Sequence, residues 1–542
     1  MVPHSPTSDG AAQQAARGEH FESIHHVLEV AAADNPRAEV VRFIGGPSIS
    51  RQELLSTARQ AAGGLRSAGV RRGDRVALMV SNRREFLEVF FAVSSLGAVC
   101  VPLNTALRGD ILIHMLKSVG PCYLIMESDL AAEAMPAVEG SASVTAIWGV
   151  PVEGYALPRG SMEYADLLGH GSLTAAVDCA DSDLAAILFT SGTTGPSKGV
   201  MWSHRMAIHF GSTSSWAMGY RADDVVFTCL PLFHINALFT SFLPALQQKA
   251  SVVIAQRFSA STYWAEIAGS GATVTNMLGA MVAILWNRPP SDEERDHRLR
   301  LALIIPFPLG REEEYRSRFG LELTELYGST DTGMPIATPH GESRAGACGI
   351  AAPGWEVKLF DEFDRPVKVG ESGELVTRPT APFVGQLGYW RLPEKTWEAH
   401  RNSWFHTGDQ FREDEDGWFY FQDRLKDAMR VSGENVSSYE VEQVLLSHPA
   451  VAEVAVFAVP SDLGEDSVMA GVVLREGEQL NPADLREFAE PRLPYFAVPR
   501  YFEMLDDLPK TSTQKIRKAA LRERGVSIHT WDGGQLRRGR IA

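Results

Sequence analysis

Strand and helix patterns alternate along the first two thirds of the chain, and this alternation restricts the fold more than any other feature. Residues 51–68 have the apolar spacing of a helix, residues 75–80 (RVALMV) read as a buried strand, and residues 98–103 form a second apolar strand pattern. Repeated strand–helix–strand order is typical of parallel sheets covered by helices. We therefore predict an α/β fold for this part of the chain.

The chain is too long for one core. Its 542 residues suggest two or three domains. After about residue 361 turn-rich, charged segments separate short strands, and Asn481 followed by Pro482 is a typical start of a helix. We predict a large N-terminal domain of helix-covered sheets over residues 21–423, a small α+β C-terminal domain over residues 424–542, and a disordered tail over residues 1–20.

Composition excludes several classes of protein. With 51 Lys and Arg against 67 Asp and Glu, the net charge of −16 argues against a nucleic-acid partner. The five cysteines are widely spaced without a CxxC pair, which is typical of buried free thiols in a reducing compartment. Residues 225–248 carry no charge, but Pro231 and Pro244 interrupt them, so we expect a core strand, loop and helix and no membrane span. Because the N-terminus lacks the pattern of a signal peptide, we expect a cytoplasmic protein.

One glycine-rich segment indicates phosphate binding. A buried strand over residues 184–189 leads into TSGTTGPSKG, residues 190–199. Three glycines allow close backbone approach, and successive N–H groups, five hydroxyls and one lysine can donate to phosphate oxygens. The candidate ATP-binding residues here are Thr190, Ser191, Gly192, Thr193, Thr194, Gly195 and Lys198.

Two other motifs fail for this segment. A Walker loop requires glycine directly before the lysine, but residue 197 is serine. Gly195-x-Ser197-x-Gly199 formally matches a nucleophile elbow, which needs a sharp turn from strand into helix. Residues 200–202 instead continue as a predicted strand, and Ser203 is the expected N-cap of the next helix.

The ten-residue loop resembles the phosphate loop of the adenylate-forming superfamily, which includes acyl-CoA synthetases, luciferases and peptide-synthetase adenylation domains. Further motifs in the family's order cover nearly the whole chain. The first is LYGSTD, residues 326–331. The resemblance implies that Tyr327 stacks on adenine, Thr330 contacts the α-phosphate and Asp331 holds Mg²⁺, although the family usually has Glu at the last position.

Four later segments imply the rest of the nucleotide and CoA sites. WFHTGD (404–409) implies that Asp409 binds the ribose hydroxyls. DRLKD (423–427) and VSGEN (431–435) imply that Arg424 reaches the nucleotide, Lys426 is the hinge of a mobile C-terminal domain and Gly433 lines the CoA tunnel. LPKTSTQKIR (508–517) implies that Lys515 is the catalytic lysine bridging the acyl carboxylate and the α-phosphate; Gln514 stands where the family has Gly.

The acyl site is implied by PLFHIN, residues 231–236, in which His234 closes the site until ATP binds. Relatives that activate amino acids usually carry Asp at the position of His234, so we expect an aliphatic or aromatic acid. The segment IPFP (305–308) replaces the family's Gly-Gly-Ala-Pro, a feature shared with carnitine/crotonobetaine-type CoA ligases, although no cage for a quaternary ammonium group is visible. The predicted pocket residues are His209, Ile235, Met277, Leu278, Phe307 and Met334.

The resemblance implies an ATP-dependent carboxylic acid:CoA ligase that forms acyl-AMP and pyrophosphate and then acyl-CoA and AMP. ATP and Mg²⁺ are the expected cofactors, CoA is the co-substrate, and a homodimer remains open. An alternative is an adenylating enzyme that passes the acyl group to a carrier-protein thiol or an amine. A remote alternative is a nucleotide-binding protein without catalysis.

Overall fold

The computed structural model describes residues 21–190, 197–305, 307, 311–424, 429–431, 434–460, 466–493, 497–510 and 515–534. Contacts divide the chain into two compact units. The first comprises Met1–Thr190, Ser197–Val357 and Thr377–Phe405, and the second comprises Ser191–Pro196, Lys358–Val376 and His406–Ala542. The predicted domain boundary at residue 424 and the predicted hinge near Lys426 concern the movement of the C-terminal domain. Both stay predictions.

A seven-stranded sheet forms the first half of unit 1, with strand order β7–β6–β5–β3–β4–β8–β9. Neighbouring strands are parallel as far as β8, and β9 pairs with β8 antiparallel. The strands predicted near residues 75, 98 and 184 are three of its members, so the predicted α/β class is confirmed. Their bounds are β3 (Arg75–Met79), β4 (Val99–Pro102), β5 (Cys122–Glu127), β6 (Val144–Val150), β7 (Met162–Glu163), β8 (Leu184–Phe189) and β9 (Gly199–Ser203).

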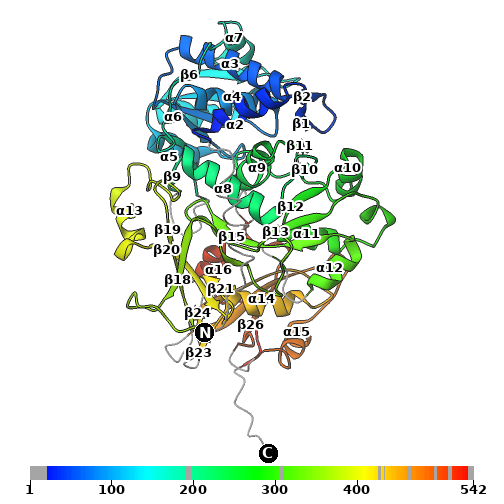
Figure 1. Ribbon diagram of the computed structural model, residues 1–542. Coiled ribbons are helices and arrows are strands. Elements are labelled where there is room, and N and C mark those ends of the chain that lie inside the picture. Colours follow the sequence, from blue (N-terminus) through cyan, green and yellow to red (C-terminus); the bar gives the residue numbers. More distant parts are fainter. Residues whose placement is uncertain are drawn as a thin grey trace, which may run out of the picture. The chain divides into compact units, whose positions relative to one another are not determined.

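Helices pack on this sheet, as the spacing of apolar residues in the helical segments predicts (Figure 1). The helix expected over residues 51–68 is α3 (Arg51–Ser67), which begins with a capping box between Ser50 and Glu53. It packs along α4, whose phenylalanines are buried. The helices of this half are α2 (Ile24–Asp34), α4 (Arg84–Ser95), α5 (Gly109–Val119), α6 (Ala131–Ser141) and α7 (Tyr164–Leu168), with a 3₁₀ turn η1 (Ser128–Leu130).

A second seven-stranded sheet has the order β14–β13–β12–β10–β11–β1–β2 and is parallel except for β2. Its strands are β1 (Glu39–Phe43), β2 (Ser48–Ser50), β10 (Val225–Thr228), β11 (Ser251–Ile254), β12 (Val274–Leu278), β13 (Leu301–Ile305) and β14 (Glu322–Thr324). The accompanying helices are α8 (His204–Met218), α10 (Tyr263–Ser270), α11 (Gly279–Trp286), η3 (Asp292–Glu294) and α12 (Glu312–Phe319). One hydrophobic cluster joins residues of both sheets, among them Val76, Leu188 and Phe227.

The uncharged run over residues 225–248 forms β10, a loop, the π-helix η2 (Asn236–Phe242) and α9 (Leu243–Gln247). The predicted order of strand, loop and helix is confirmed, whereas the π-helical form was not predicted. Across the described part of the chain, no helix combines the length and apolar character that crossing a membrane requires.

Three smaller sheets follow along the chain. β15 (Leu326–Ser329), β16 (Gly333–Ala337) and β17 (Ile350–Ala351) form one in unit 1, and the sheet β18–β19–β20–β21 contains the boundary between the units. Unit 2 also holds the hairpin β22–β23 and the sheet β24–β25–β26–β27. The predicted cap at Asn481 is present, because its side chain accepts from Ala483 and Asp484 N–H groups.

The remaining bounds are β18 (Trp355–Phe360), β19 (Ser372–Pro379), α13 (Pro393–Ala399), η4 (Arg401–Ser403), β20 (Phe405–Glu413), β21 (Phe419–Arg424), β22 (Met429–Val431), β23 (Glu434–Val436), α14 (Ser438–Leu446), β24 (Val451–Pro460), β25 (Asp466–Leu474), α15 (Pro482–Ala489), β26 (Tyr501–Met504), α16 (Lys518–Arg524) and β27 (Trp531–Asp532).

Candidate active site

The predicted adenine and phosphate residues lie in a tight hairpin. Strands β15 and β16 pair antiparallel, and the turn between them carries Thr330 and Asp331. Two reciprocal hydrogen bonds of 3.0 Å, Ser329 N–H to Thr332 Oγ1 and Thr332 N–H to Ser329 Oγ, fix this turn. A Cβ atom on Gly328 would lie 2.5 Å from the Gly333 carbonyl oxygen, so the hairpin requires glycine next to Tyr327.

A second hairpin, β8–β9, carries the predicted phosphate loop. The Thr190 N–H donates to the Lys198 carbonyl oxygen at 3.0 Å, and the Lys198 N–H donates to Thr190 Oγ1 at 3.3 Å. The predicted ligands Ser191, Gly192, Thr193, Thr194 and Gly195 lie outside the described residues. The chain continues as strand β9, and Ser203 Oγ caps α8 by accepting from the Met206 N–H at 2.9 Å. A nucleophile elbow, which needs a helix directly after the turn, is therefore excluded.

The two hairpins contact each other. The indole N–H of Trp202 donates to the Thr330 carbonyl oxygen at 2.9 Å. The Tyr389 hydroxyl donates to Asp331 Oδ1 at 2.6 Å, and the Lys198 ammonium lies 3.9 Å from the centroid of the Tyr389 ring. Lys198, predicted to bind phosphate, and Asp331, predicted to hold the metal, therefore share one tyrosine.

The role of Tyr389 was not predicted from the sequence. Its side chain is buried, and burial together with the adjacent Asp331 carboxylate raises the pKa of its phenol far above the usual value. The phenol is therefore neutral at ordinary pH and can donate to the carboxylate. A buried aromatic residue in the segment GYW, residues 388–390, is the only local signal, and it does not distinguish this role from core packing.

The loop before His234 is held by a residue from the other sheet. Asn82, 6% exposed, follows β3 and donates from Nδ2 to the carbonyl oxygens of Leu230 (3.0 Å) and Ala255 (2.8 Å). Its Oδ1 accepts from the Leu232 N–H at 2.8 Å. Asn82 thus joins the carboxyl end of β3 to the ends of β10 and β11, the edge at which open α/β sheets bind ligands.

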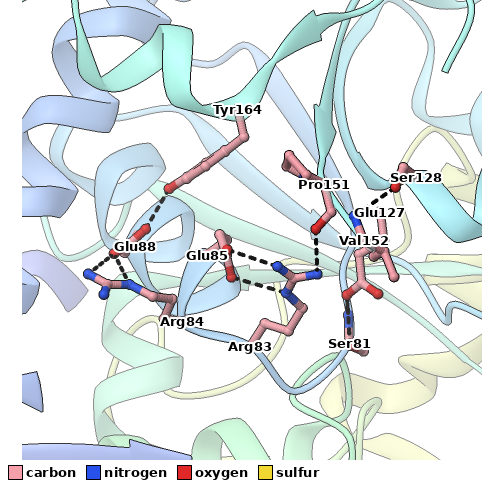
Figure 2. A network of polar contacts seen from close by, with 10 residues as sticks. All are labelled: Ser81, Arg83, Arg84, Glu85, Glu88, Glu127, Ser128, Pro151, Val152 and Tyr164. Carbon is pink, nitrogen blue, oxygen red and sulfur yellow. Dashed lines mark hydrogen bonds and ion pairs between the residues drawn. The ribbon is translucent and has the colours of Figure 1, made fainter. Parts of the chain in front are cut away.

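The segment around Asn82 is itself braced (Figure 2). Ser81 donates to the buried Glu127 carboxylate through its N–H (2.6 Å) and its hydroxyl (2.7 Å). Arg83 contacts the Glu85 carboxylate and the Pro151 carbonyl oxygen. These contacts fix the backbone on both sides of Asn82, so its amide is presented to the 230–232 loop without a large loss of entropy.

His234 lies two residues before the π-helix η2, a form that often marks functional sites. The Leu238 N–H donates to the His234 carbonyl oxygen at 3.2 Å, and the ring of His234 lies 4.6 Å from that of Phe233. On β12, the buried Asn276 amide donates to Asn236 Oδ1 (3.1 Å) and to Ser241 Oγ (2.7 Å). Asn82, from the loop after β3, and Asn276, from β12, therefore hold the segment that carries the predicted gate.

The predicted acyl-pocket residues all belong to unit 1. Met277, Phe307 and Met334 are buried in the main hydrophobic cluster, and Ile235 and Leu278 pack against it. His209, on α8, contacts the Pro353 carbonyl oxygen through Nε2 at 3.0 Å, and burial lowers its pKa to about 4. His209 is therefore neutral and donates this hydrogen bond. That these side chains line one pocket stays a prediction.

Phe307, which replaces a small residue of the family, is positioned by a half-buried acid. Its N–H donates to Glu325 Oε1 at 3.3 Å, and its ring packs edge to face on Tyr315 with centroids 5.5 Å apart. Burial raises the pKa of Glu325 to about 8. Glu325 directly precedes the Leu326–Tyr327 motif and was not predicted from the sequence.

In unit 2, Asp409 and Arg424 are cross-strand partners on β20 and β21. Glu374, on β19, braces the segment before Asp409, since its carboxylate accepts from the Gly408 N–H at 3.0 Å and contacts His406 Nδ1 at 2.8 Å. Thr407 Oγ1 accepts from the Asp409 N–H at 3.1 Å. Two of the predicted nucleotide residues are therefore brought to adjacent positions of one sheet.

Lys515 lies exposed just before the bridge between Lys510 and Ile516. The other lysine of this motif, Lys510, is engaged in ion pairs of 2.8 Å with Glu453 and Asp507. Of the two lysines, Lys515 is exposed and Lys510 is half-buried. The hinge residue Lys426, the tunnel residue Gly433 and the departing residue Gln514 lie outside the described residues.

Comparisons with known proteins identify the family of the chain. Residues 28–390 match the AMP-binding enzyme family, and residues 440–515 match the AMP-binding enzyme C-terminal domain. The chain belongs to the AMP-binding enzyme family.

Individual members of the family align over most of their length. Crotonobetaine/carnitine–CoA ligase of Salmonella paratyphi A is 32% identical over 464 residues, which are 84% of this chain and 89% of that protein. The structure of ATP-bound MatB from Rhodopseudomonas palustris has a TM-score of 0.82 at 28% identity and covers 93% of this chain and 99% of its own. A benzoate CoA ligase from Burkholderia xenovorans LB400 has a TM-score of 0.82 at 25% identity, covering 93% of this chain and all of its own.

These relatives confirm the predicted enzyme class. The protein is an AMP-forming acyl-CoA synthetase that uses ATP, Mg²⁺ and CoA. The resemblance to the adenylate-forming superfamily and the two-part α/β architecture are confirmed as well.

Proposed function

We propose that this ligase activates an aliphatic or aromatic carboxylic acid and that the two joined hairpins of unit 1 hold the triphosphate during the first step. One observation carries the proposal: Lys198 and Asp331 are held at the same tyrosine, with Thr330 bonded to the strand that follows Lys198. A cation for phosphate oxygens and a carboxylate for a hard metal ion then contact the same side chain.

The residues present fit Mg²⁺ bound together with ATP. The described residues contain no group of three His, Cys, Asp or Glu side chains that could cage a metal. Mg²⁺ is commonly held by one or two carboxylates and the substrate phosphates, and Asp331 supplies one such carboxylate on an accessible turn. When bound, the ion would neutralise charge on the phosphate oxygens.

In the first step a carboxylate oxygen of the acid attacks the α-phosphorus of ATP, the bond to the β-phosphate oxygen breaks, and pyrophosphate leaves. Thr330 and Lys515 contact the α-phosphate in this proposal, Tyr327 stacks on adenine, and Asp409 and Arg424 hold the nucleotide. Lys515 lies in unit 2, so the proposal requires the C-terminal domain to bring it to the reacting atoms.

In the second step the CoA thiol loses its proton to solvent and attacks the acyl carbonyl carbon, the bond from this carbon to the phosphate oxygen breaks, and AMP leaves as the thioester forms. Gly433 lines the path of the pantetheine arm and Lys426 is the hinge. The apolar character of Met277, Phe307 and Met334 supports an acid with an apolar acyl group. His209 is neutral, which supports an acid that carries no charged group where it contacts His209.

The test is pyrophosphate release from ATP with a panel of fatty, aromatic and betaine acids, each with and without CoA. The panel includes carnitine and crotonobetaine because curated relatives are ligases for those acids. We expect acid-dependent release and formation of a thioester only when CoA is present. Acid-dependent release without thioester formation would replace CoA with another acceptor, and no acid-dependent release would refute the proposal.

Two further parts of the proposal concern context. We place the enzyme in the cytoplasm, supported by five cysteines that are all buried and free of disulfide bonds. We also keep a homodimer as the assembly to be tested, for which light scattering of the purified full chain is decisive.

A further inference from the structure

Tyr389 occupies a position fixed by the strand that follows the phosphate loop. The segment around it pairs with β9, through bonds from Leu387 N–H to Met201 O (2.9 Å), Met201 N–H to Gly388 O (2.9 Å) and Trp390 N–H to Gly199 O (2.7 Å). The Tyr389 N–H also donates to Thr396 Oγ1 at 2.8 Å. The phenol therefore moves with the strand that leads from Lys198.

Each part of the Tyr389 side chain contacts a different charged group. The hydroxyl donates to Asp331 Oδ1 at 2.6 Å, which is the length of a strong, charge-assisted bond. The ring face lies under the Lys198 ammonium at 3.9 Å, within the range of a cation–π contact. The hydroxyl bond engages one carboxylate oxygen, and among the described residues no hydrogen bond to Asp331 Oδ2 is present.

This arrangement depends on the aspartate. A glutamate at residue 331 would carry its carboxylate farther from the backbone by one C–C bond, about 1.5 Å, which exceeds what a 2.6 Å hydrogen bond tolerates. Asp331 and the Tyr389 hydroxyl are thus matched to each other in this chain.

We propose that Tyr389 is a positioning residue for MgATP: its hydroxyl holds Asp331 Oδ1 and leaves Oδ2 as the oxygen that would bind the metal ion, and its ring holds the Lys198 ammonium, which would bind the phosphates. The inference rests on the proposed function of Lys198 and Asp331. It adds that a single side chain links the phosphate-binding cation to the metal-binding carboxylate. The two contacts can be removed separately, since the carboxylate contacts the hydroxyl and the cation contacts the ring.

Two substitutions distinguish the contact of the Tyr389 hydroxyl from the contact of its ring. Tyr389→Phe keeps the ring and removes the hydroxyl, whereas Tyr389→Leu removes both. The probe is Mn²⁺, titrated into the full chain with α,β-methylene-ATP, which cannot release pyrophosphate. Paramagnetic resonance gives the metal dissociation constant, and calorimetry at saturating Mn²⁺ gives that of the nucleotide.

We expect Tyr389→Phe to weaken Mn²⁺ binding about 10-fold, the effect of losing a hydrogen bond to a charged group, and to change nucleotide affinity less than about 2-fold. Tyr389→Leu should weaken Mn²⁺ binding equally and nucleotide binding by about 5-fold, from the lost cation–π contact. Asp331→Glu should weaken Mn²⁺ binding in the wild-type background and weaken it less in the Tyr389→Phe background, where the hydroxyl no longer occupies the space.

Tyr420→Phe is the matched control. The Tyr420 hydroxyl donates to Asp414 Oδ2 at 2.9 Å, and the guanidinium of Arg412 lies 4.4 Å from its ring centroid. It therefore repeats the pairing of acid, phenol and cation within unit 2, at residues that have no role in the proposed site. We expect Tyr420→Phe to retain wild-type affinity for both ligands.

Unchanged Mn²⁺ affinity in Tyr389→Phe would overturn the inference, and so would identical losses of metal and nucleotide affinity in both Tyr389 variants. A wild-type chain that binds Mn²⁺ and the nucleotide but shows no acid-dependent pyrophosphate release would refute the proposed function and leave the assignment of Tyr389 standing. A wild-type chain that binds neither would refute both.

Discussion

Replacing Asn82 by alanine tests whether one buried amide positions the loop of the predicted acyl gate. The substitution removes three hydrogen bonds at once and leaves the carbonyl oxygens of Leu230 and Ala255 and the N–H of Leu232 without the amide. All three residues are at most 5% exposed. At about 1 kcal/mol for each buried group left unsatisfied, the local cost is about 3 kcal/mol.

Hydrogen exchange of the peptide that covers residues 230–234 measures this cost, because opening of the loop exposes the Leu232 N–H. A loss of about 3 kcal/mol corresponds to exchange that is about 100-fold faster. In the same variant we expect kcat/KM for the acid to fall by about 10-fold or more while nucleotide affinity stays within about 2-fold, since the loop carries His234 and no predicted ATP ligand.

Two further variants make the test specific. Asn82→Asp has nearly the same shape and keeps the acceptor for Leu232 N–H, but it turns a carboxylate toward two carbonyl oxygens, so it should be worse than alanine. Ser81→Ala is the control from the same loop, because it loses only the hydroxyl bond to Glu127 and keeps the backbone bond. The reasoning is refuted if Asn82→Ala exchanges like the wild type, or if Asn82→Asp is the more protected of the two.

Three other predictions follow from the site. Lys515→Ala should lower the rate of acyl-AMP formation by about 10²–10³-fold with ATP binding intact, measured as pyrophosphate exchange; an unchanged rate would remove Lys515 from the first step. Gly433→Leu should spare adenylation and block thioester formation, and equal loss of both half-reactions would count against a tunnel there. Glu325, whose folded pKa of about 8 lies above its usual 4.5, stabilises the fold below pH 4.5 and loses that stability as the pH rises to about 8. The excess melting temperature of Glu325→Gln over the wild type should therefore grow between pH 5 and pH 8 and level off above, although partial exposure of the side chain reduces the size of the effect; a constant difference across this range would show that Glu325 is ionised at all of these pH values.

Much of the fold followed from local pattern. The helix at α3, the strands β3, β4 and β8 and the caps at Ser203 and Asn481 all lie where apolar spacing and capping residues placed them. Such features depend on residues a few positions apart, so the sequence displays them directly. The π-helical form of η2 did not follow, because its geometry depends on contacts with Asn276, which lies on a strand that is distant in the sequence.

The residues of the candidate site also divide into those that were predicted from the sequence and those that were not. Thr330, Asp331, Lys198, Asp409 and Lys515 were predicted because each lies in a short motif that resembles one of the family, and their roles stay predictions. Glu374 and Glu325 were missed, since a carboxylate that accepts a backbone N–H has no distinctive neighbours in the sequence. Their roles are defined by partners that only the folded chain supplies.

The sequence by itself determined the α/β class, the order of the motifs and the enzyme family, because strand–helix alternation and motif spacing are properties of the chain as written. Only the tertiary structure decided which side chains hold the motifs in place. Tyr389 reaches Asp331 across 58 residues, and Asn82 reaches Leu232 across 150. These pairs form where separate strands and loops are brought into register by the packing of two sheets, and no local pattern of residues specifies that register.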